Sequence, residues 1–207
     1  MVMKNPPRVF VSYTHDSAEH KDQVLLFSQF LVAQKIDIIL DQWFLENRQD
    51  WYTWAIGNIA SADFVLTIAS DRYKRAAEGA VTREDNRGLQ AEAALLRENL
   101  EENRPLWMTK ILPVVLPGHR VEEIPIFLQP RTADHYVVTE FTVAGAESLL
   151  RVLTGQPPHV RPELGRTPDL PPHQPVPAPS GHNVQNINSS GGTINAVQGG
   201  TQNFYGR

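Results

Sequence analysis

The run Phe64-Val65-Leu66-Thr67-Ile68-Ala69 is almost entirely apolar. A strand with one face in water alternates apolar and polar residues, whereas an unbroken apolar run is typical of a central parallel strand buried on both faces. The segment before it, from Trp51 to Ile59, has the apolar spacing of a helix. The run therefore predicts a parallel sheet covered by helices on both faces.

Working outward from this run, strands and helices alternate along the chain. Further strands are predicted at residues 8–13, 36–40, 111–116 and 136–138. Further helices are predicted after Ser17, which can act as N-cap, and around an apolar stripe of Ala91, Ala94 and Leu95. A closing helix is predicted from Ala144 to Leu153, ended by Gly155. This order predicts an α/β fold with a five-stranded parallel sheet. Binding sites of such sheets form at the carboxyl ends of the strands.

The composition excludes several classes of protein. The chain has 207 residues and a net charge of −4, which argues against a general nucleic-acid binder. It contains no cysteine, so disulfides, thiol nucleophiles and cysteine-ligated metals are ruled out. The seven histidines do not show the paired spacing of a zinc site, and no metal is predicted. No apolar run is long enough to span a bilayer, and a cytoplasmic location is expected.

Three zones differ in composition. Residues 8–155 carry nearly all of the large apolar side chains and are predicted to fold as one domain. Residues 156–180 are rich in proline and are predicted to be an extended linker. Residues 181–207 are rich in Asn, Gln, Ser, Thr and Gly, with no charged residue between His182 and Arg207. This last zone is read either as a self-associating tail or as a disordered C-terminal extension.

Several motifs in the folded zone resemble one family. Val9-Phe10-Val11-Ser12-Tyr13, followed by His15-Asp16, resembles the first box of the TIR superfamily. Asp41-Gln42-Trp43, the segment from Trp51 to Ile59, and the segment from Ala62 to Ser70 resemble the SEFIR branch more closely. The resemblance covers residues 8–154. It implies a flavodoxin-like fold and self-association through domain contacts.

Some TIR domains cleave NAD with one glutamate on the helix after the third strand. The resemblance places that glutamate at Glu92 and implies that NAD is a substrate and not a resident cofactor. Ser12, Tyr13, Trp43 and Arg48 are then expected to contact the nucleotide. The enzymatic pattern often has a tryptophan four positions before the glutamate, where this chain has Gly88. A glutamate on a helix is otherwise ordinarily a solvated surface residue.

The tail has a second resemblance. The pair Val-Gln occurs at 184–185 and again at 197–198, with a turn predicted at residues 189–192. The segment from Val197 to Asn203 resembles the core of RHIM-like amyloid signalling motifs, although Gly199 stands where those cores prefer Ile or Val. The resemblance implies tail self-association and an upstream sensor with a matching motif.

Two functions from different classes therefore stay open. The first is an innate-immune or defence effector that hydrolyses NAD when it is clustered, that is, an NAD glycohydrolase. The second is a non-enzymatic adaptor that acts by homotypic SEFIR/TIR contacts.

Overall fold

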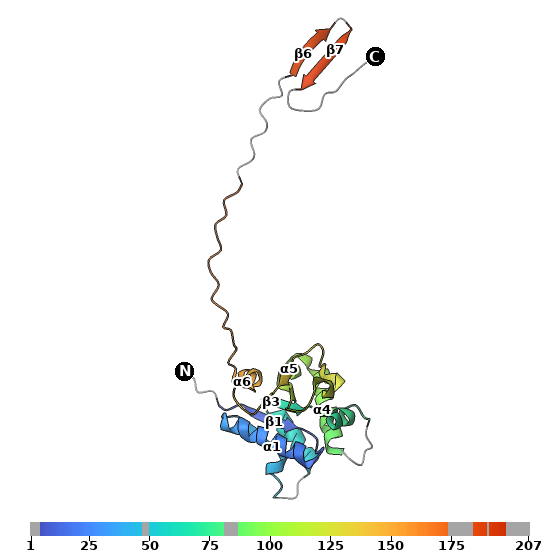
Figure 1. Cartoon of the computed structure of the whole chain (residues 1–207), viewed down its shortest axis with the longest axis vertical. Coiled ribbons are helices and arrows are strands. Elements are labelled where there is room, and N and C mark those ends of the chain that lie inside the picture. The colour runs from blue at the N-terminus through green and yellow to red at the C-terminus, as the bar shows by residue number, and fades with distance from the viewer. Residues whose placement is uncertain (1–4, 47–49, 81–86, 174–183, 190, 198–207) are drawn as a thin grey trace. The chain divides into compact units, whose positions relative to one another are not determined.

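The computed structural model describes residues 5–46, 50–80, 87–173, 184–189 and 191–197, with only the backbone described for the two strands within 184–197 (Figure 1). Its contacts divide the chain into two units, residues 1–160 and residues 161–207. Each unit is described by itself.

The first unit contains the five-stranded sheet expected from the sequence, with the strand order β2-β1-β3-β4-β5. All neighbouring strands run parallel. The strands are β1 (Arg8–Ser12), β2 (Asp37–Ile39), β3 (Phe64–Ile68), β4 (Ile111–Val115) and β5 (Tyr136–Val137). The α/β fold class predicted from the sequence is confirmed, and the run 64–68 is the central strand.

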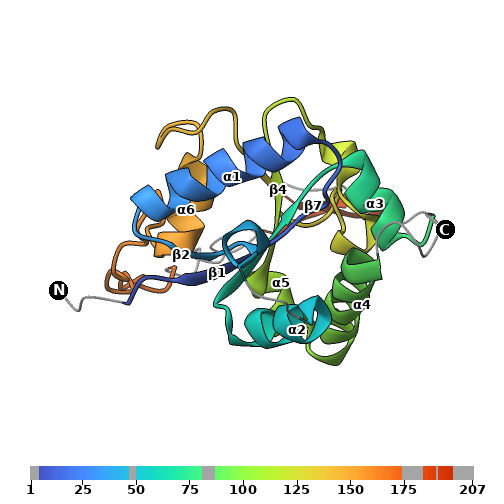
Figure 2. The same ribbon diagram turned by 90° about the horizontal axis from the view of Figure 1, so that it is seen from below.

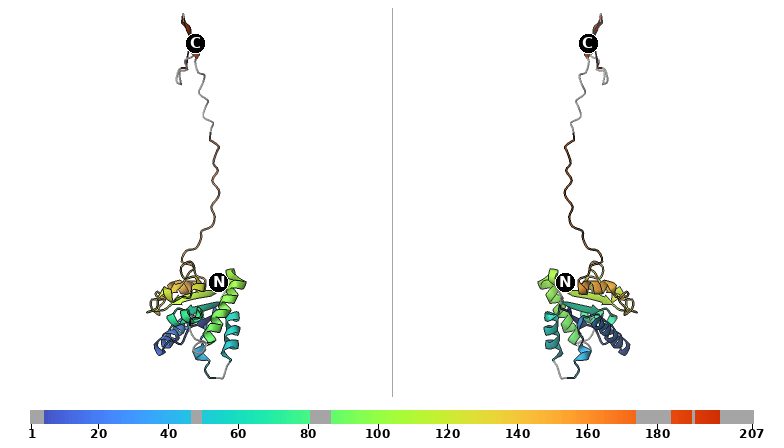
Figure 3. Two further views of the ribbon diagram at one scale, coloured as in Figure 1. Left: turned by 90° about the vertical axis from the view of Figure 1, so that its right-hand side faces the viewer. Right: turned by 90° about the vertical axis from the view of Figure 1, so that its left-hand side faces the viewer.

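Helices cover both faces of this sheet. They are α1 (Ala18–Ala33), α2 (Trp51–Ser61), α3 (Asp71–Ala77), α4 (Arg87–Glu102), α5 (Arg104–Lys110) and α6 (Glu147–Thr154), with short 3-10 helices η1 (Asp41–Trp43), η2 (Val121–Glu123) and η3 (Ile126–Leu128). Figure 2 shows α1 and α6 on one side of the sheet and α2, α4 and α5 on the other. The two side views of Figure 3 show the same layers by colour, blue and orange against cyan and green.

Successive side chains of one strand supply the two layers of core. Val9 and Val11 of β1 pack in a cluster with Phe27 of α1, whereas Phe10 packs in a second cluster with Ile59 of α2 and Leu96 of α4. This follows from the period of two residues along a strand. Both faces of the sheet are covered by buried apolar side chains, as the unbroken apolar runs predict.

Pro113 lies inside β4, where a proline removes a hydrogen-bond donor. The carbonyl of Val114 accepts from Ala69 next to β3, and that of Val115 accepts from Val138 next to β5. Backbone groups alternate between sides, so Pro113 faces β5. That edge strand pairs only with Val114 and Val115. The proline is tolerated because the N–H that it lacks would point toward β5 at a position before the pairing of β4 with β5 begins at Val114.

The sequence interpretation was wrong about one helix face and missed two helices. The buried residues of α4 are Leu89, Ala93, Leu96 and Leu100. Of the predicted stripe, Leu95 is half-buried against the core, Ala91 is half-buried and Ala94 is exposed. The correct stripe of α4 faces α3 at one end and the sheet further along. The two missed helices, α3 and α5, have seven residues each, too few to show a helical period clearly.

The second unit contains no helix or strand in residues 161–173, as its prolines predict. Strands β6 (Val184–Ser189) and β7 (Gly192–Val197) then form an antiparallel hairpin. Its register pairs Asn186 with Asn195 and Ile187 with Ile194. The turn lies where the sequence predicts it, between the two Val-Gln pairs.

Candidate functional site

Polar side chains gather where the central strands end. The chain passes from β1 to β2 on one side and then to β3 on the other side of β1, so the strand order reverses at β1. In open α/β sheets, ligands bind outside the carboxyl ends of the strands at such a point. Ser12 ends β1, Tyr13 and Thr14 follow it, and Ser70 comes after β3.

Glu92 reaches this edge from α4. The buried stripe through Leu89, Ala93 and Leu96 fixes the rotation of the helix, and Glu92 lies on the flank of that stripe, partly buried. The hydroxyl of Ser12 donates a hydrogen bond of 2.8 Å to Oε2 of Glu92. The structure thus places side by side two residues that the sequence assigns to one site.

The Glu92 carboxyl has an unusual proton affinity. Burial raises its pKa to about 7, and the negative charge of Asp41 acts in the same direction. The hydrogen bond from Ser12 and the nearby His15 oppose this rise. Strong shifts caused by burial together with specific partners are concentrated at functional sites. Near neutral pH this group can exist both as carboxylate and as carboxylic acid.

A second group of side chains surrounds Asp41, at the start of η1. The hydroxyl of Tyr13 donates to Oδ1 of Asp41 at 2.9 Å, and Nε2 of His15 lies 2.9 Å from Oδ2. Burial, followed by Asp41, raises the pKa of Tyr13, which therefore stays protonated. The ring of Tyr13 is buried, and its hydroxyl holds the loop after β2 against the end of β1.

Of the other two residues expected to contact the nucleotide, the structure describes only Trp43, which lies apart from these contacts. Trp43 is about two-fifths exposed, at 38%. It lines a surface hollow with Val32 and Ile38 beside the edge strand β2, so its described surroundings are at that edge and not at Glu92. Arg48 lies outside the described residues.

Sequence reasoning missed three polar contacts at this edge of the sheet. The hydroxyl of Tyr73, in α3, lies 3.1 Å from Oγ of Ser12. The hydroxyls of Thr14 and Ser70 are 2.9 Å apart, and Ser70 also caps α3 by accepting from the backbone N–H of Tyr73. The N-cap preference for serine was the one signal that could have revealed α3 and, with it, Tyr73.

A third contact joins two histidines. Nδ1 of His20 lies 3.1 Å from Nε2 of His119, whose Nδ1 lies 2.7 Å from Oε2 of Glu123. The contacts among His20, His119 and Glu123 thus connect α1 to the segment after β4. Burial lowers the pKa of His20, with Asp16 acting in the opposite direction.

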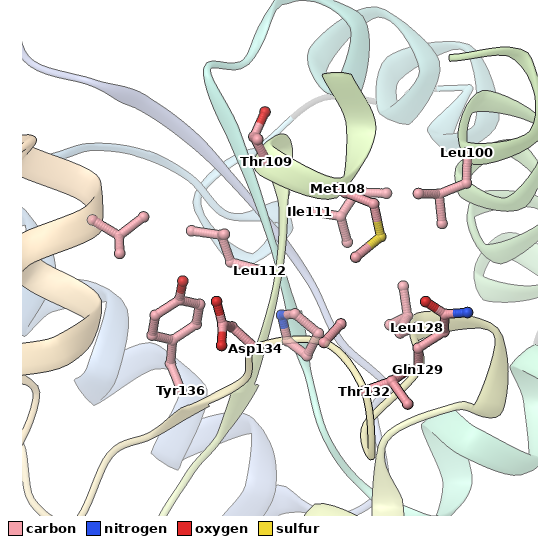
Figure 4. Close-up of a pocket in the computed structure, with 13 residues that line it drawn as sticks. Leu100, Met108, Thr109, Ile111, Leu112, Leu128, Gln129, Thr132, Asp134 and Tyr136 are labelled. Atoms are coloured by element: carbon pink, nitrogen blue, oxygen red, sulfur yellow. The ribbon is translucent and has the colours of Figure 1, made fainter. Parts of the chain in front are cut away.

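A cavity of about 450 Å³ lies elsewhere in the first unit. It borders the first residues of β4 and the start of β5, and Figure 4 shows Asp134 beside Tyr136 on one side, with Met108 and Ile111 on the other. None of the residues that line it is a predicted site residue. The cavity is therefore distinct from the group of side chains around Glu92.

The described part of the chain offers no candidate metal centre and no candidate membrane-spanning helix. No group of three or more His, Asp or Glu side chains there is arranged to hold a metal ion. None of the helices that the structure describes combines the length and the hydrophobicity needed to cross a bilayer.

Comparisons with known proteins agree with this architecture. The family model of the SEFIR domain matches residues 7–148. A crystal structure of a prokaryotic SEFIR domain is similar with a TM-score of 0.54 and 26% sequence identity, over 77% of this chain and 99% of that chain. The SEFIR domain of IL-17 receptor B shares the fold with a TM-score of 0.50 and 18% identity, over 73% of this chain and 99% of that chain. No curated protein matches significantly.

Proposed function

Because the chain belongs to the SEFIR family, whose domains signal through homotypic contacts, we propose that it is a defence effector whose clustered SEFIR domain cleaves NAD. The observation that carries the proposal is the Glu92 carboxyl, held by Ser12 at the carboxyl ends of the strands. In this proposal, clustering of the domains is the signal, and hydrolysis of NAD is the output.

The chemistry needs only one carboxylate. In NAD the nicotinamide ring is cationic and leaves the ribose as a neutral molecule, so no acid has to protonate it. As the N-glycosidic bond breaks, positive charge develops on the ribose, and a preorganised carboxylate stabilises that charge. Water then adds its oxygen to the ribose carbon and releases one proton. Glu92 has the residue type and the position for this role.

The proton affinity of Glu92 is compatible with this role. A carboxyl whose pKa is about 7 is ionised in roughly half of the molecules at neutral pH by definition of the pKa. Binding of a cationic ring next to it favours the ionised form further. At NAD concentrations well below KM, where the free enzyme sets the pH dependence, cleavage should therefore increase as the pH rises through 7.

The tail supports clustering as the trigger. An isolated two-stranded hairpin such as β6–β7 is marginally stable by itself and leaves both of its edges unpaired. Uncharged segments with Asn and Gln stack in register with copies of themselves. An upstream sensor with a matching motif would template this stacking. The RHIM-like segment from Val197 onward lies almost wholly outside the described residues.

A specific observation favours the second candidate, the adaptor that only recruits partners. Gly88 stands where the enzymatic pattern often has a tryptophan, and it is exposed with open space around it. This helix therefore offers no aromatic ring for the nicotinamide at position 88. The adaptor keeps the homotypic contacts of the domain and omits the cleavage step.

The deciding experiment measures nicotinamide release from NAD by the full chain, both dispersed and clustered by a fused oligomerising module. We expect release from the clustered wild type and a loss of at least about a hundredfold, the lower end for positioned acid–base or charge-stabilising groups, in the clustered Glu92→Ala variant. Glu98→Ala, an exposed glutamate on the same helix, is the matched control and should keep full activity. If the clustered wild type releases no nicotinamide, the adaptor is the correct function.

A further inference from the structure

Three side chains from three elements form a chain of hydrogen bonds behind the proposed site. Tyr73 comes from α3, Ser12 from β1 and Glu92 from α4. The hydroxyl of Tyr73 lies 3.1 Å from Oγ of Ser12, and Oγ of Ser12 lies 2.8 Å from Oε2 of Glu92. Tyr73 is fully buried and Ser12 is 1% exposed, so solvent does not compete for these contacts.

The direction of the chain follows from counting protons. A serine hydroxyl has one proton to donate and two lone pairs that accept. When Glu92 is ionised it only accepts, so the Ser12 proton points to Oε2. The contact between Tyr73 and Ser12 must then be donated by Tyr73. Burial raises the pKa of Tyr73, which keeps that donor protonated at neutral pH.

We propose that Tyr73 and Ser12 act as a relay that positions the ionised carboxylate of Glu92 and do not contact the nucleotide themselves. Donation from Tyr73 polarises the Ser12 hydroxyl and makes it a stronger donor to Glu92, because hydrogen bonds in a chain reinforce one another. This role replaces the contact with the nucleotide that the sequence predicts for Ser12. Burial of Ser12 supports the change of role, since a ligand cannot reach a side chain that is enclosed.

The relay has a consequence that a merely structural pair of hydroxyls lacks. Each donated hydrogen bond favours the charged form of Glu92, so loss of a donor raises the pH at which Glu92 ionises. Loss of Ser12 removes the bond to Glu92 itself, whereas loss of the Tyr73 hydroxyl only weakens it. The two variants should therefore shift the titration in the same direction, with the larger shift for Ser12.

The test is a titration of the full chain labelled with ¹³C at the glutamate carboxyl carbons. The Glu92 signal is identified by its disappearance in Glu92→Gln, and its midpoint is followed in Tyr73→Phe and Ser12→Ala. We expect a rise of about one to two pH units for Ser12→Ala, the value of one hydrogen bond to a charged group, and a smaller rise for Tyr73→Phe. Tyr136→Phe removes the same hydroxyl from a tyrosine at the separate cavity and should leave the midpoint unchanged.

An unchanged midpoint in a folded Tyr73→Phe protein overturns the relay, and Tyr73→Phe decides alone if Ser12→Ala does not fold. The relevance of the relay to catalysis rests on the proposed function, but the titration does not use NAD. If the midpoint shifts but no nicotinamide is released, the relay is supported and NAD cleavage is rejected. If nicotinamide is released but the midpoint does not shift, NAD cleavage is supported and the relay is rejected. If NAD is cleaved, Tyr73→Phe should lower kcat and leave KM unchanged, as expected of a positioning residue.

Discussion

At the scale of single residues, burial of Glu92 makes the stability of the fold depend on pH. The ordinary pKa of a glutamate is 4.5, and the pKa of Glu92 in this site is about 7. Between these two pH values, Glu92 binds more protons in the folded state than in the unfolded state. The free energy of unfolding therefore decreases as the pH rises through this range. The Glu92→Gln variant lacks this titration. We expect the wild type to lose about 1–3 kcal/mol relative to Glu92→Gln between pH 4.5 and pH 8.

Urea unfolding at pH 4.5, 6 and 8 checks this prediction. Glu98→Gln changes an exposed glutamate of the same helix, and its difference from the wild type should stay nearly constant across the three values. A difference for Glu92→Gln that does not change with pH would mean that Glu92 ionises as it does in an unfolded chain.

The residues of the site differ in how far the sequence predicts them. Ser12 could be placed at the carboxyl end of its strand because an apolar run that stops at a hydroxyl residue marks where the strand ends. Glu92 required the family resemblance, since its neighbours on α4 include several exposed charges. Tyr73 could not be predicted: it lies among Asp71, Lys74 and Arg75, which make the segment resemble a solvated surface. Its burial depends on packing against α4.

At the scale of elements, the segment before α6 depends on the absence of one side chain. A Cβ added at Gly145 would collide with Cγ of Glu140 and would lie 2.5 Å from its carbonyl oxygen. The backbone here is fixed on both sides, since the N–H of Gly145 donates to Thr142 and its carbonyl accepts from Thr139. We expect Gly145→Ala to destabilise the protein by about 1–3 kcal/mol, the usual cost of overpacking.

The control for this prediction is Gly57→Ala. Gly57 lies in α2 with nothing within 4 Å of an added Cβ, and alanine is the better helix former by about 1 kcal/mol. This variant should unfold at a higher urea concentration than the wild type, whereas Gly145→Ala should unfold at a lower one. Equal effects from the two substitutions would show that the segment 139–146 adapts to the extra carbon.

The elements that the sequence predicts are those in which burial and periodicity coincide. All five strands of the sheet and the cap of α1 at Ser17 were predicted, because buried strands leave unbroken apolar runs and caps require particular residue types. The two missed helices begin at Asp71 and Arg104, directly after the N-cap residues Ser70 and Asn103, whose side chains accept a backbone N–H. The signal was local and was overlooked because α3 and α5 are too short for an apolar face to repeat.

At the scale of the whole molecule, the proposed function assigns the output and the trigger to different units of the chain. The first unit contains the complete sheet and the group around Glu92, and the second contains the proline-rich segment and the hairpin. A domain tethered to a self-associating segment reaches effective concentrations in the millimolar range without any new contact of its own. Under the proposed function, the domain is inactive when dispersed and active when the tails assemble, with no change in its fold.

This division predicts that a break in the tail abolishes assembly and leaves the domain intact. Proline lacks the N–H that strand pairing uses, and it is excluded from stacked strands. Ile187→Pro or Ile194→Pro should disrupt the pairing of these two residues across the hairpin and prevent sedimentation of the full chain as large assemblies. The thermal unfolding temperature of the first unit should not change, because both substitutions fall in the second unit.

Leu164→Pro is the matched control, because the same substitution falls in a segment without helix or strand, at a side chain that is 86% exposed. It should assemble like the wild type. Nicotinamide release should follow the same division: lost in the two hairpin variants at low protein concentration, kept in Leu164→Pro, and restored in the hairpin variants by a fused oligomerising module. Restoration by the module shows that the tail acts by concentrating the domain. Failure of the module to restore release would mean that the tail contributes directly to the site, and the separation of trigger from output would have to be abandoned.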